Sequence, residues 1–340
     1  MNPRNPTFLL RAALLLTLAG ILALGGVVVL RGVPPAGPAA PAPAIRKPEG
    51  AVRAESCRDC RSCHPAQWAE WSSSRHAAAW TNPPLKAFAE LSLGLEDCVK
   101  CHAPAPVLVT GAGELPRERS RERETGVDCL TCHLAAHGIA GPRGSPEAPC
   151  APALREELRE SGVCKGCHRT IALDWEESPA AAKGLQCRDC HMPERKGTPL
   201  APPSPGRSHD PRGGHDPEML RRAFSFEVRI EGGEAVATVT NLGAGHNFPG
   251  ERHFRILQVE ARVLDESGRT VDESRRVIKD VTPIRRARRD SDIRAGEKAE
   301  LRFRPGIPRG SIVARLLYKL YPTVLDAEAL ALAEERREFP

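Results

Sequence analysis

Large aromatic side chains are scarce in this chain. Phe, Trp and Tyr make up only 4% of the 340 residues, with two tyrosines, and there are three methionines. Aromatic side chains supply much of the buried apolar area in ordinary globular domains, so a core built mainly on them is excluded here. The chain therefore needs another source of apolar bulk.

A basic surface suited to nucleic acid is also missing. The formal net charge is +6, and the arginine-rich stretches are interrupted by Glu and Asp, as in RERSRERETG at 117–126. Proteins that bind nucleic acid concentrate lysine and arginine on one face or along one helix. We therefore expect a solvated surface of mixed charge and no nucleic-acid partner.

One run near the N-terminus carries no charge. It extends from Ala12 to Leu30, and its length at about 1.5 Å per residue covers the roughly 30 Å of a bilayer's hydrocarbon. Arg4 and Arg11 precede it and place the N-terminal side in the cytoplasm. Residues 1–31 are predicted to form a single-pass transmembrane helix in the inner membrane, with the rest in the periplasm. A cleaved signal peptide is the alternative and gives the same export.

The composition changes repeatedly after this run. Residues 32–54 are dominated by Pro and Ala and predict an extended linker. Cysteine motifs and short helical patches fill 55–222 and predict a mainly helical and irregular domain. Within 223–325, runs of alternating apolar and polar residues are separated by turns such as EGG, which predicts an antiparallel β-sandwich of immunoglobulin-like architecture. The composition of 326–340 favours a helical tail.

Most of the 12 cysteines fall in five segments of the form Cys-x-x-Cys-His, which we call the first to fifth sockets. In chain order they contain Cys60, Cys63 and His64; Cys98, Cys101 and His102; Cys129, Cys132 and His133; Cys164, Cys167 and His168; and Cys187, Cys190 and His191. The spacing lets two thiols bond to two vinyl groups of one porphyrin edge while the adjacent imidazole binds the iron. The sequence therefore predicts five covalent c-type haems, which also supply apolar bulk.

Other uses of paired cysteines do not explain this pattern. Zinc sites and disulfide frameworks do not require a histidine directly after the second cysteine. Only 11 of the 340 residues are histidine, so five such coincidences are not expected by chance. Cys57 and Cys150 lie outside the sockets, and the sequence leaves open whether they form a disulfide.

Histidines outside the sockets are candidates for the second ligand of an iron. His76 follows His64 by twelve residues in a helix-like segment, so about 18 Å would separate them along a helix and His76 should serve a different haem. His137 follows His133 by four residues, which on a helix places both on one face, so it too should bind another iron.

His209 and His246 complete the predicted second ligands. His246 lies in the glycine-rich loop NLGAGHNFPG, between two predicted strands. His215 competes with His209, and His253 is a further candidate that could equally be an ordinary strand residue. Imidazole on both faces of the iron favours lower reduction potentials than Met/His ligation.

Several segments together resemble the cytochrome c-552/4 family of multihaem cytochromes. They are CHPAQWAEWSSSRHAAAW (63–80), GVDCLTCHLAAHG (126–138), CHMP (190–193), SHDPRGGHDPEML (208–220) and GAGHNFPG (243–250). The resemblance implies that His76, His137 and a histidine of 208–220 are ligands of other haems in the cluster. It also implies that His246 is a ligand offered by the β-domain.

The sequence favours electron transfer over catalysis. None of the sockets has lysine in place of histidine, as the catalytic haem often does in related reductases, and Tyr318 and Tyr321 lie in the predicted sandwich. The alternative is an oxidoreductase that acts on a small nitrogen or sulfur compound at a five-coordinate haem. A third possibility is a β-domain that docks a redox partner. The expected partners are redox proteins or a quinol-linked membrane complex.

Overall fold

The computed structural model describes residues 54–86, 96–195, 206–250, 254–279 and 292–340. Among these residues, no helix combines the length and apolar character needed to cross a bilayer. The anchor predicted at 1–31, most of the linker at 32–54 and the candidate ligand His253 lie outside the described residues. The boundaries drawn between the domains remain predictions.

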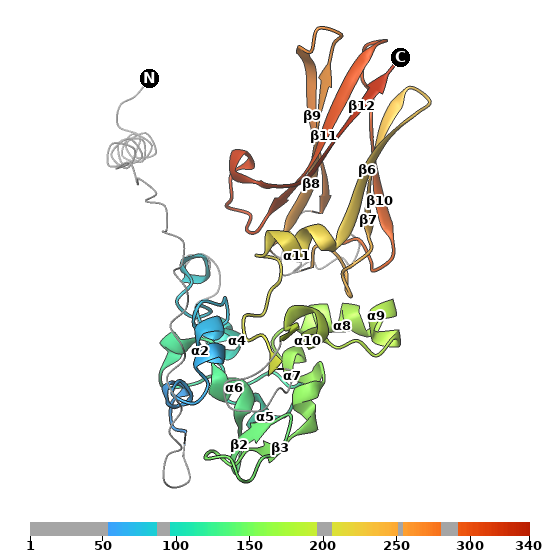
Figure 1. Cartoon of the computed structure of the whole chain (residues 1–340). Helices are drawn as coiled ribbons and strands as arrows, with labels where there is room; N and C mark the ends of the chain where they lie inside the picture. The colour runs from blue at the N-terminus through green and yellow to red at the C-terminus, as the bar shows by residue number, and fades with distance from the viewer. Residues whose placement is uncertain (1–53, 87–95, 196–205, 251–253, 280–291) are drawn as a thin grey trace, which may run out of the picture. The chain divides into compact units, whose positions relative to one another are not determined.

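The chain up to Arg222 forms short helices joined by turns and two- to four-residue strands, which fits the expected helical and irregular character (Figure 1). The helices are α2 (Pro65–Ser72), α4 (Glu96–His102), α5 (Val107–Thr110), α6 (Cys129–His133), α7 (Gly162–Lys165), α8 (Arg169–Glu176), α9 (Pro179–Ala182), α10 (Cys187–His191) and α11 (Pro217–Arg222). The short 3-10 helices are η1 (Cys57–Cys60), η2 (Arg123–Thr125) and η3 (Glu156–Arg159). The strands are β1 (Leu134–Ala135), β2 (Gly138–Gly141), β3 (Ala153–Leu154), β4 (Glu194–Arg195) and β5 (Gly206–Arg207).

Two helices are shorter than the sequence suggests. Helix α2 ends at Ser72, where the hydroxyls of Ser72 and Ser73 donate to the carbonyl of Ala69. Such side-chain bonds compete with the helical backbone pattern. His76 therefore lies beyond the helix, not at its end.

Helix α6 ends at His133, since Leu134 is already extended. The chain then forms the β1–β2 hairpin, in which Ala135 pairs with Gly138. His137 is exposed at the turn of this hairpin. The helical relation between His133 and His137 assumed from their spacing is therefore wrong.

The C-terminal part forms two antiparallel sheets, as the alternating pattern predicts. The six expected strands are β6 (Phe224–Glu231), β7 (Glu234–Asn241), β8 (Ile256–Leu264), β9 (Thr270–Lys279), β10 (Lys298–Phe303) and β11 (Gly310–Lys319). One sheet has the order β10-β7-β6, and the other has the order β12-β11-β8-β9, in which β12 is Leu330–Phe339. Buried side chains of both sheets share one apolar core, which includes Val228, Val239, Val259, Ile312 and Leu316.

The predicted helical tail is wrong. Residues 326–328 form one 3-10 turn, η4 (Asp326–Glu328), and β12 (Leu330–Phe339) pairs antiparallel with β11. The Ala, Leu and Glu content favours a helix locally, but strand pairing and burial of Leu332 and Phe339 in the sandwich core override that preference. The sandwich thus extends to the end of the chain.

Candidate haem sites

Each socket is built on one helical turn. The second, third and fifth sockets lie in α4, α6 and α10. In the first and fourth, the backbone N–H of the histidine donates to the carbonyl of the first cysteine, His64 to Cys60 at 2.8 Å and His168 to Cys164 at 3.0 Å. Because residues i, i+3 and i+4 share a helix face, this turn presents both sulfurs and the imidazole on one side.

Three socket histidines each face a histidine from another segment. The ring centroids are 6.4 Å apart for His76 and His168, 6.3 Å for His133 and His209, and 6.2 Å for His191 and His246. The interplanar angles are 28°, 27° and 9°. We call these the three facing pairs, and they join the fourth, third and fifth sockets to distant parts of the chain.

The spacing of the facing pairs fits a metal held between two imidazoles. An imidazole nitrogen lies about 2.0 Å from a bound metal and about 1.1 Å from its own ring centre, so two imidazoles on one metal have centroids about 6.2 Å apart. All three pairs lie within 0.2 Å of this value, although they come from unrelated segments. Together with the paired cysteines, the donor set fits covalently attached haem c.

The second nitrogen of several of these rings faces a backbone carbonyl. Nδ1 lies 2.8 Å from the Ala140 oxygen in His133, 3.0 Å from the Arg207 oxygen in His209 and 2.8 Å from the Asn247 oxygen in His246. Nδ1 of His191 faces the Arg212 oxygen in the same way. A proton on Nδ1 that is donated to a carbonyl leaves the lone pair on Nε2 for the metal and fixes the ring orientation.

Burial keeps these imidazoles neutral. Desolvation lowers the pKa of His76 to about 4, and nearby His168 adds to the effect. Burial also lowers the pKa of His133 and of His191, although in both the backbone carbonyl contact opposes the shift. Neutral imidazole is the form that binds a metal, so the buried setting favours ligation.

The third socket also positions His76. The N–H of Val127 donates to the His76 carbonyl at 2.9 Å, and the indole N–H of Trp71 donates to the Val127 carbonyl at 2.8 Å. Gly126 has φ +62, and a Cβ on it would lie 2.3 Å from the His76 carbonyl oxygen. The loop before α6 therefore holds the backbone of the His76 segment in place.

Replacing Gly126 with alanine should displace the His76 segment. Gly126 has φ 62 and ψ −132, a sparsely populated conformation that costs an ordinary residue about 1–3 kcal/mol, and the clash with the His76 carbonyl adds to this cost. We expect a lower thermal midpoint and a larger high-spin fraction in the oxidised spectrum. Gly184→Ala is the matched control, because Gly184 has φ +75 but nothing within 4 Å of its added Cβ. Equal effects of the two substitutions would show that only the backbone strain matters.

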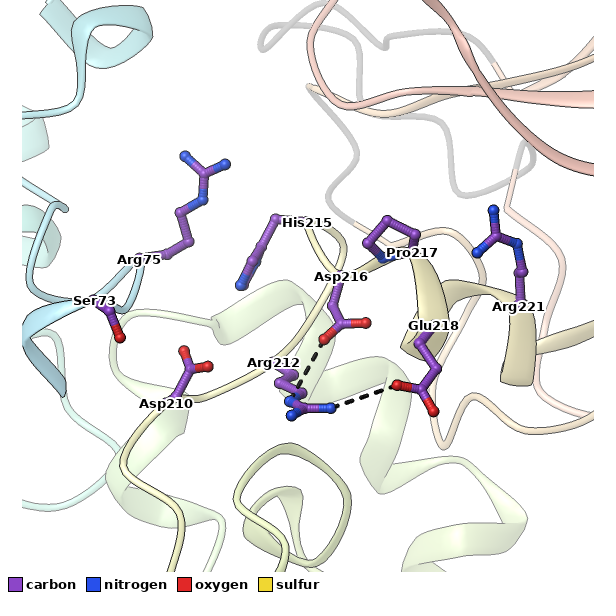
Figure 2. A pocket seen from close by; sticks show the side chains of 9 residues that line it. All are labelled: Ser73, Arg75, Asp210, Arg212, His215, Asp216, Pro217, Glu218 and Arg221. Atoms are coloured by element: carbon purple, nitrogen blue, oxygen red, sulfur yellow. Dashed lines mark ion pairs between the residues drawn. The ribbon is translucent and has the colours of Figure 1, made fainter. Parts of the chain in front are cut away.

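Within the described part of the chain, His64, His137 and His215 belong to no facing pair. Among the described residues, no ring faces His64 or the exposed His137 at a comparable distance. His102 directs Nδ1 to the Ala79 carbonyl at 2.9 Å and makes a further contact. His215 lines a pocket of about 440 Å³ with Arg75 and Asp210 (Figure 2). Of the two histidines in 208–220, His209 is thus the one opposite a socket.

The pocket around His215 is polar and balanced in charge. Arg212 lies between Asp216 and Glu218, 3.5 Å and 3.8 Å from their carboxylates (Figure 2). Burial lowers the pKa of His215, and the Arg75 guanidinium lowers it further. The pocket therefore surrounds a neutral histidine with acidic and basic side chains.

Side-chain contacts connect the sockets to one another. Cys60 of the first socket lies close enough to Cys129 of the third for each to shift the pKa of the other. In the same way, Cys167 of the fourth socket lies close to Cys101 of the second, and Cys164 lies close to Cys187 of the fifth. Cys132 of the third socket is also close enough to both cysteines of the fourth socket to raise their pKa. The first socket thus lies beside the third, and the third lies beside the fourth. The second and fifth sockets also lie beside the fourth.

The two cysteines outside the sockets are free thiols. Cys57 is fully buried, and burial, followed by the charge of Asp128, raises its pKa to about 12. Burial also raises the pKa of Cys150. The structure holds no disulfide between these two residues.

Sequence reasoning missed the residues that support the sockets. Asp128 caps α6 by accepting from the N–H of Thr131 at 3.0 Å, and it is buried against Arg119. Asn241, also fully buried, organises the loop that carries His246. An Asp three residues before Thr is a recognisable capping signal, whereas nothing in the sequence marks Asn241 or Arg119 as special.

Comparisons with known proteins find multihaem cytochromes c that are similar to this chain. Residues 59–134, which include the first three sockets, match the family model described as cytochrome c554 and c-prime. The predicted resemblance to the multihaem cytochromes c is confirmed. A penta-haem cytochrome c552 from Thermochromatium tepidum has a similar fold, with a TM-score of 0.60 and 21% identity over 84% of this chain and 98% of that one.

Other matches are partial. A superoxide reductase from Nanoarchaeum equitans matches 35% of this chain and 94% of its own at 16% identity, with a TM-score of 0.22. Among curated proteins, none matches this chain. The similarity to multihaem cytochromes c therefore depends on two findings: the family-model match over the first three sockets and the similar fold of the penta-haem structure.

Proposed function

We propose that the chain transfers electrons through five covalently bound c-type haems, with imidazole on both faces of at least three irons. The observation that carries the proposal is the common spacing of the three facing pairs, 6.2 to 6.4 Å. A second imidazole fills the position that a substrate would need on the iron. Sites of this kind exchange electrons without binding a substrate.

The contacts between sockets support the same function. Cysteines of neighbouring sockets lie near one another in the pairs Cys60 and Cys129, Cys101 and Cys167, and Cys164 and Cys187, in each of which one cysteine influences the pKa of the other. Haems bonded to these cysteines would therefore lie near one another. The fourth socket, which adjoins three others, is the natural junction of the electron route.

The proposed setting is the periplasmic face of the inner membrane. The uncharged run from Ala12 to Leu30, preceded by Arg4 and Arg11, supports a single-pass anchor or an export signal. Haem attachment to Cys-x-x-Cys-His segments takes place outside the cytoplasm and agrees with export. Electrons would come from, or pass to, redox proteins or a quinol-linked membrane complex.

The spectrum of the oxidised protein tests the proposal. Electron paramagnetic resonance and resonance Raman spectra should be dominated by low-spin haem, and the intact mass should include five haems. A strong high-spin signal that changes on addition of nitrite or hydroxylamine would contradict the proposal and favour the oxidoreductase alternative. A mass with fewer haems would refute the predicted number.

A further inference from the structure

One asparagine of the sandwich makes more side-chain hydrogen bonds than its position on a strand requires. Asn241 is the last residue of β7 and is fully buried. Its backbone already bonds to its neighbours, accepting from Gly296 and donating to Glu297, both at 2.9 Å. Its side chain is therefore free to serve another part of the chain.

The side-chain amide of Asn241 spans the loop that follows it. Nδ2 donates to the carbonyls of His246 at 2.9 Å and Ile293 at 3.0 Å, and Oδ1 accepts from the N–H of Ala244 at 3.2 Å. At the far side of the loop, Phe248 and Ile293 exchange two backbone hydrogen bonds. Residues 241–249, here called the His246 loop, are thus fixed at both ends and in the middle.

The loop also rests against the helices of the socket region. A Cβ on Gly243 would lie 2.2 Å from the Arg222 carbonyl oxygen, and a Cβ on Gly245 would lie 3.0 Å from the Ala180 side chain. These close approaches leave little freedom for the loop to shift. Its backbone position therefore decides where the His246 ring lies.

We propose that Asn241 is a positioning residue that holds the His246 loop so that the imidazole of His246 faces His191. The inference rests on the proposed function, in which these two histidines ligate the haem of the fifth socket. Asn241 bonds to the carbonyl of His246 itself, and the two rings lie 6.2 Å apart at 9°. The amide thus acts through the His246 backbone and does not touch the metal site.

The chemistry of the position favours asparagine. Asn241 donates to the carbonyl of His246 and to that of Ile293, which also accepts from the Phe248 N–H, and it accepts from the Ala244 N–H. Aspartate in its place would direct a second acceptor at two carbonyl oxygens. Burial on β7 does not by itself require a polar group. Thr238 on the same strand is equally buried, and its hydroxyl has no hydrogen-bond partner.

The test compares three variants of the full, haem-loaded chain. His246→Ala is the reference for loss of the ligand, Asn241→Asp removes the two donated bonds, and Thr238→Val is the matched control. The readouts are the high-spin fraction of the oxidised protein and its return to low spin when free imidazole is added. We expect Asn241→Asp to raise the high-spin fraction roughly tenfold over the parent protein, with rescue by imidazole, and Thr238→Val to leave it unchanged.

The outcomes separate this inference from the proposed function. An unchanged spectrum in His246→Ala would overturn the ligand assignment and, with it, the basis of the inference. A high-spin signal in His246→Ala but not in folded Asn241→Asp would overturn the role of Asn241 alone. If the aspartate variant does not accumulate, Asn241→Ser, which is smaller and uncharged and cannot reach all three partners, replaces it under the same criteria.

Discussion

Replacing His76 with alanine is expected to convert one low-spin haem to high spin while the other haems keep their spectra. His76 is half-buried and its ring faces His168 at 6.4 Å, so the substitution removes the imidazole opposite the fourth socket. The change should equal the signal of one haem, because His76 takes part in a single facing pair. Free imidazole should restore the low-spin signal by occupying the vacated side.

The same variant should interrupt electron transfer more than a change at the periphery does. The fourth socket adjoins the second, third and fifth, so a change in its ligation alters the reduction potential at the junction. In stopped-flow reduction, some of the haems should be reduced in a fast phase, and the remaining haems should be reduced in a slow phase.

His215→Ala is the control for His76→Ala. His215 is a half-buried histidine close enough to His76 to influence it electrostatically, yet it lines the pocket of Figure 2 and belongs to no facing pair. Its substitution should leave the spin state unchanged. A high-spin signal in His215→Ala, with none in His76→Ala, would reverse the assignment of the two residues.

The sequence predicted those features that depend on local pattern. The spacing of Cys60, Cys63 and His64, and of the other sockets, follows from the chemistry of haem attachment. The alternating runs of the sequence became β6 to β11, because alternation of apolar and polar residues is a local signal of strands; the burial itself alternates in β10 but is nearly continuous in β7, β8 and β11. The choice of His76, His209 and His246 as candidates also came from the sequence, and the structure places each of them opposite a socket histidine.

The sequence could not predict features that arise from distant contacts. Residues 330–339 have a helical composition but pair with β11, because that sheet edge offers hydrogen bonds and the core accepts Leu332. The sequence also did not show which histidine faces each socket histidine, because the members of a pair can be far apart in the chain: His168 lies more than ninety residues from His76. Such pairings depend on the folded chain and leave no trace in spacing.

Removing Arg119 is expected to destabilise the third socket strongly. Arg119 is paired with Asp128 at 2.5 Å, and their side chains are only 16% and 3% exposed. The same guanidinium donates to the carbonyls of Glu122 and Gly126 and to the hydroxyl of Thr125. Breaking a buried ion pair by removing one partner costs about 3–5 kcal/mol, because the remaining charge is left uncompensated.

Arg119→Met should therefore unfold at a much lower denaturation midpoint. The double variant Arg119→Met, Asp128→Asn should lose less free energy of unfolding than the sum of the losses in the two single variants. Arg229→Met is the control, because Arg229 makes ion pairs with Glu227 and Glu231 at the exposed surface, where such pairs contribute little.

The loop that contains Arg119 and Asp128 also holds the His76 carbonyl through Val127. Loss of Arg119 should therefore disturb two sockets: the third directly, and the fourth through His76. A fall in stability without any increase in high-spin haem would show that the network supports the fold of this loop but not the position of His76. A fall in stability together with a rise in high-spin haem would show that one largely buried arginine maintains the ligation of a haem attached some fifty residues away in sequence.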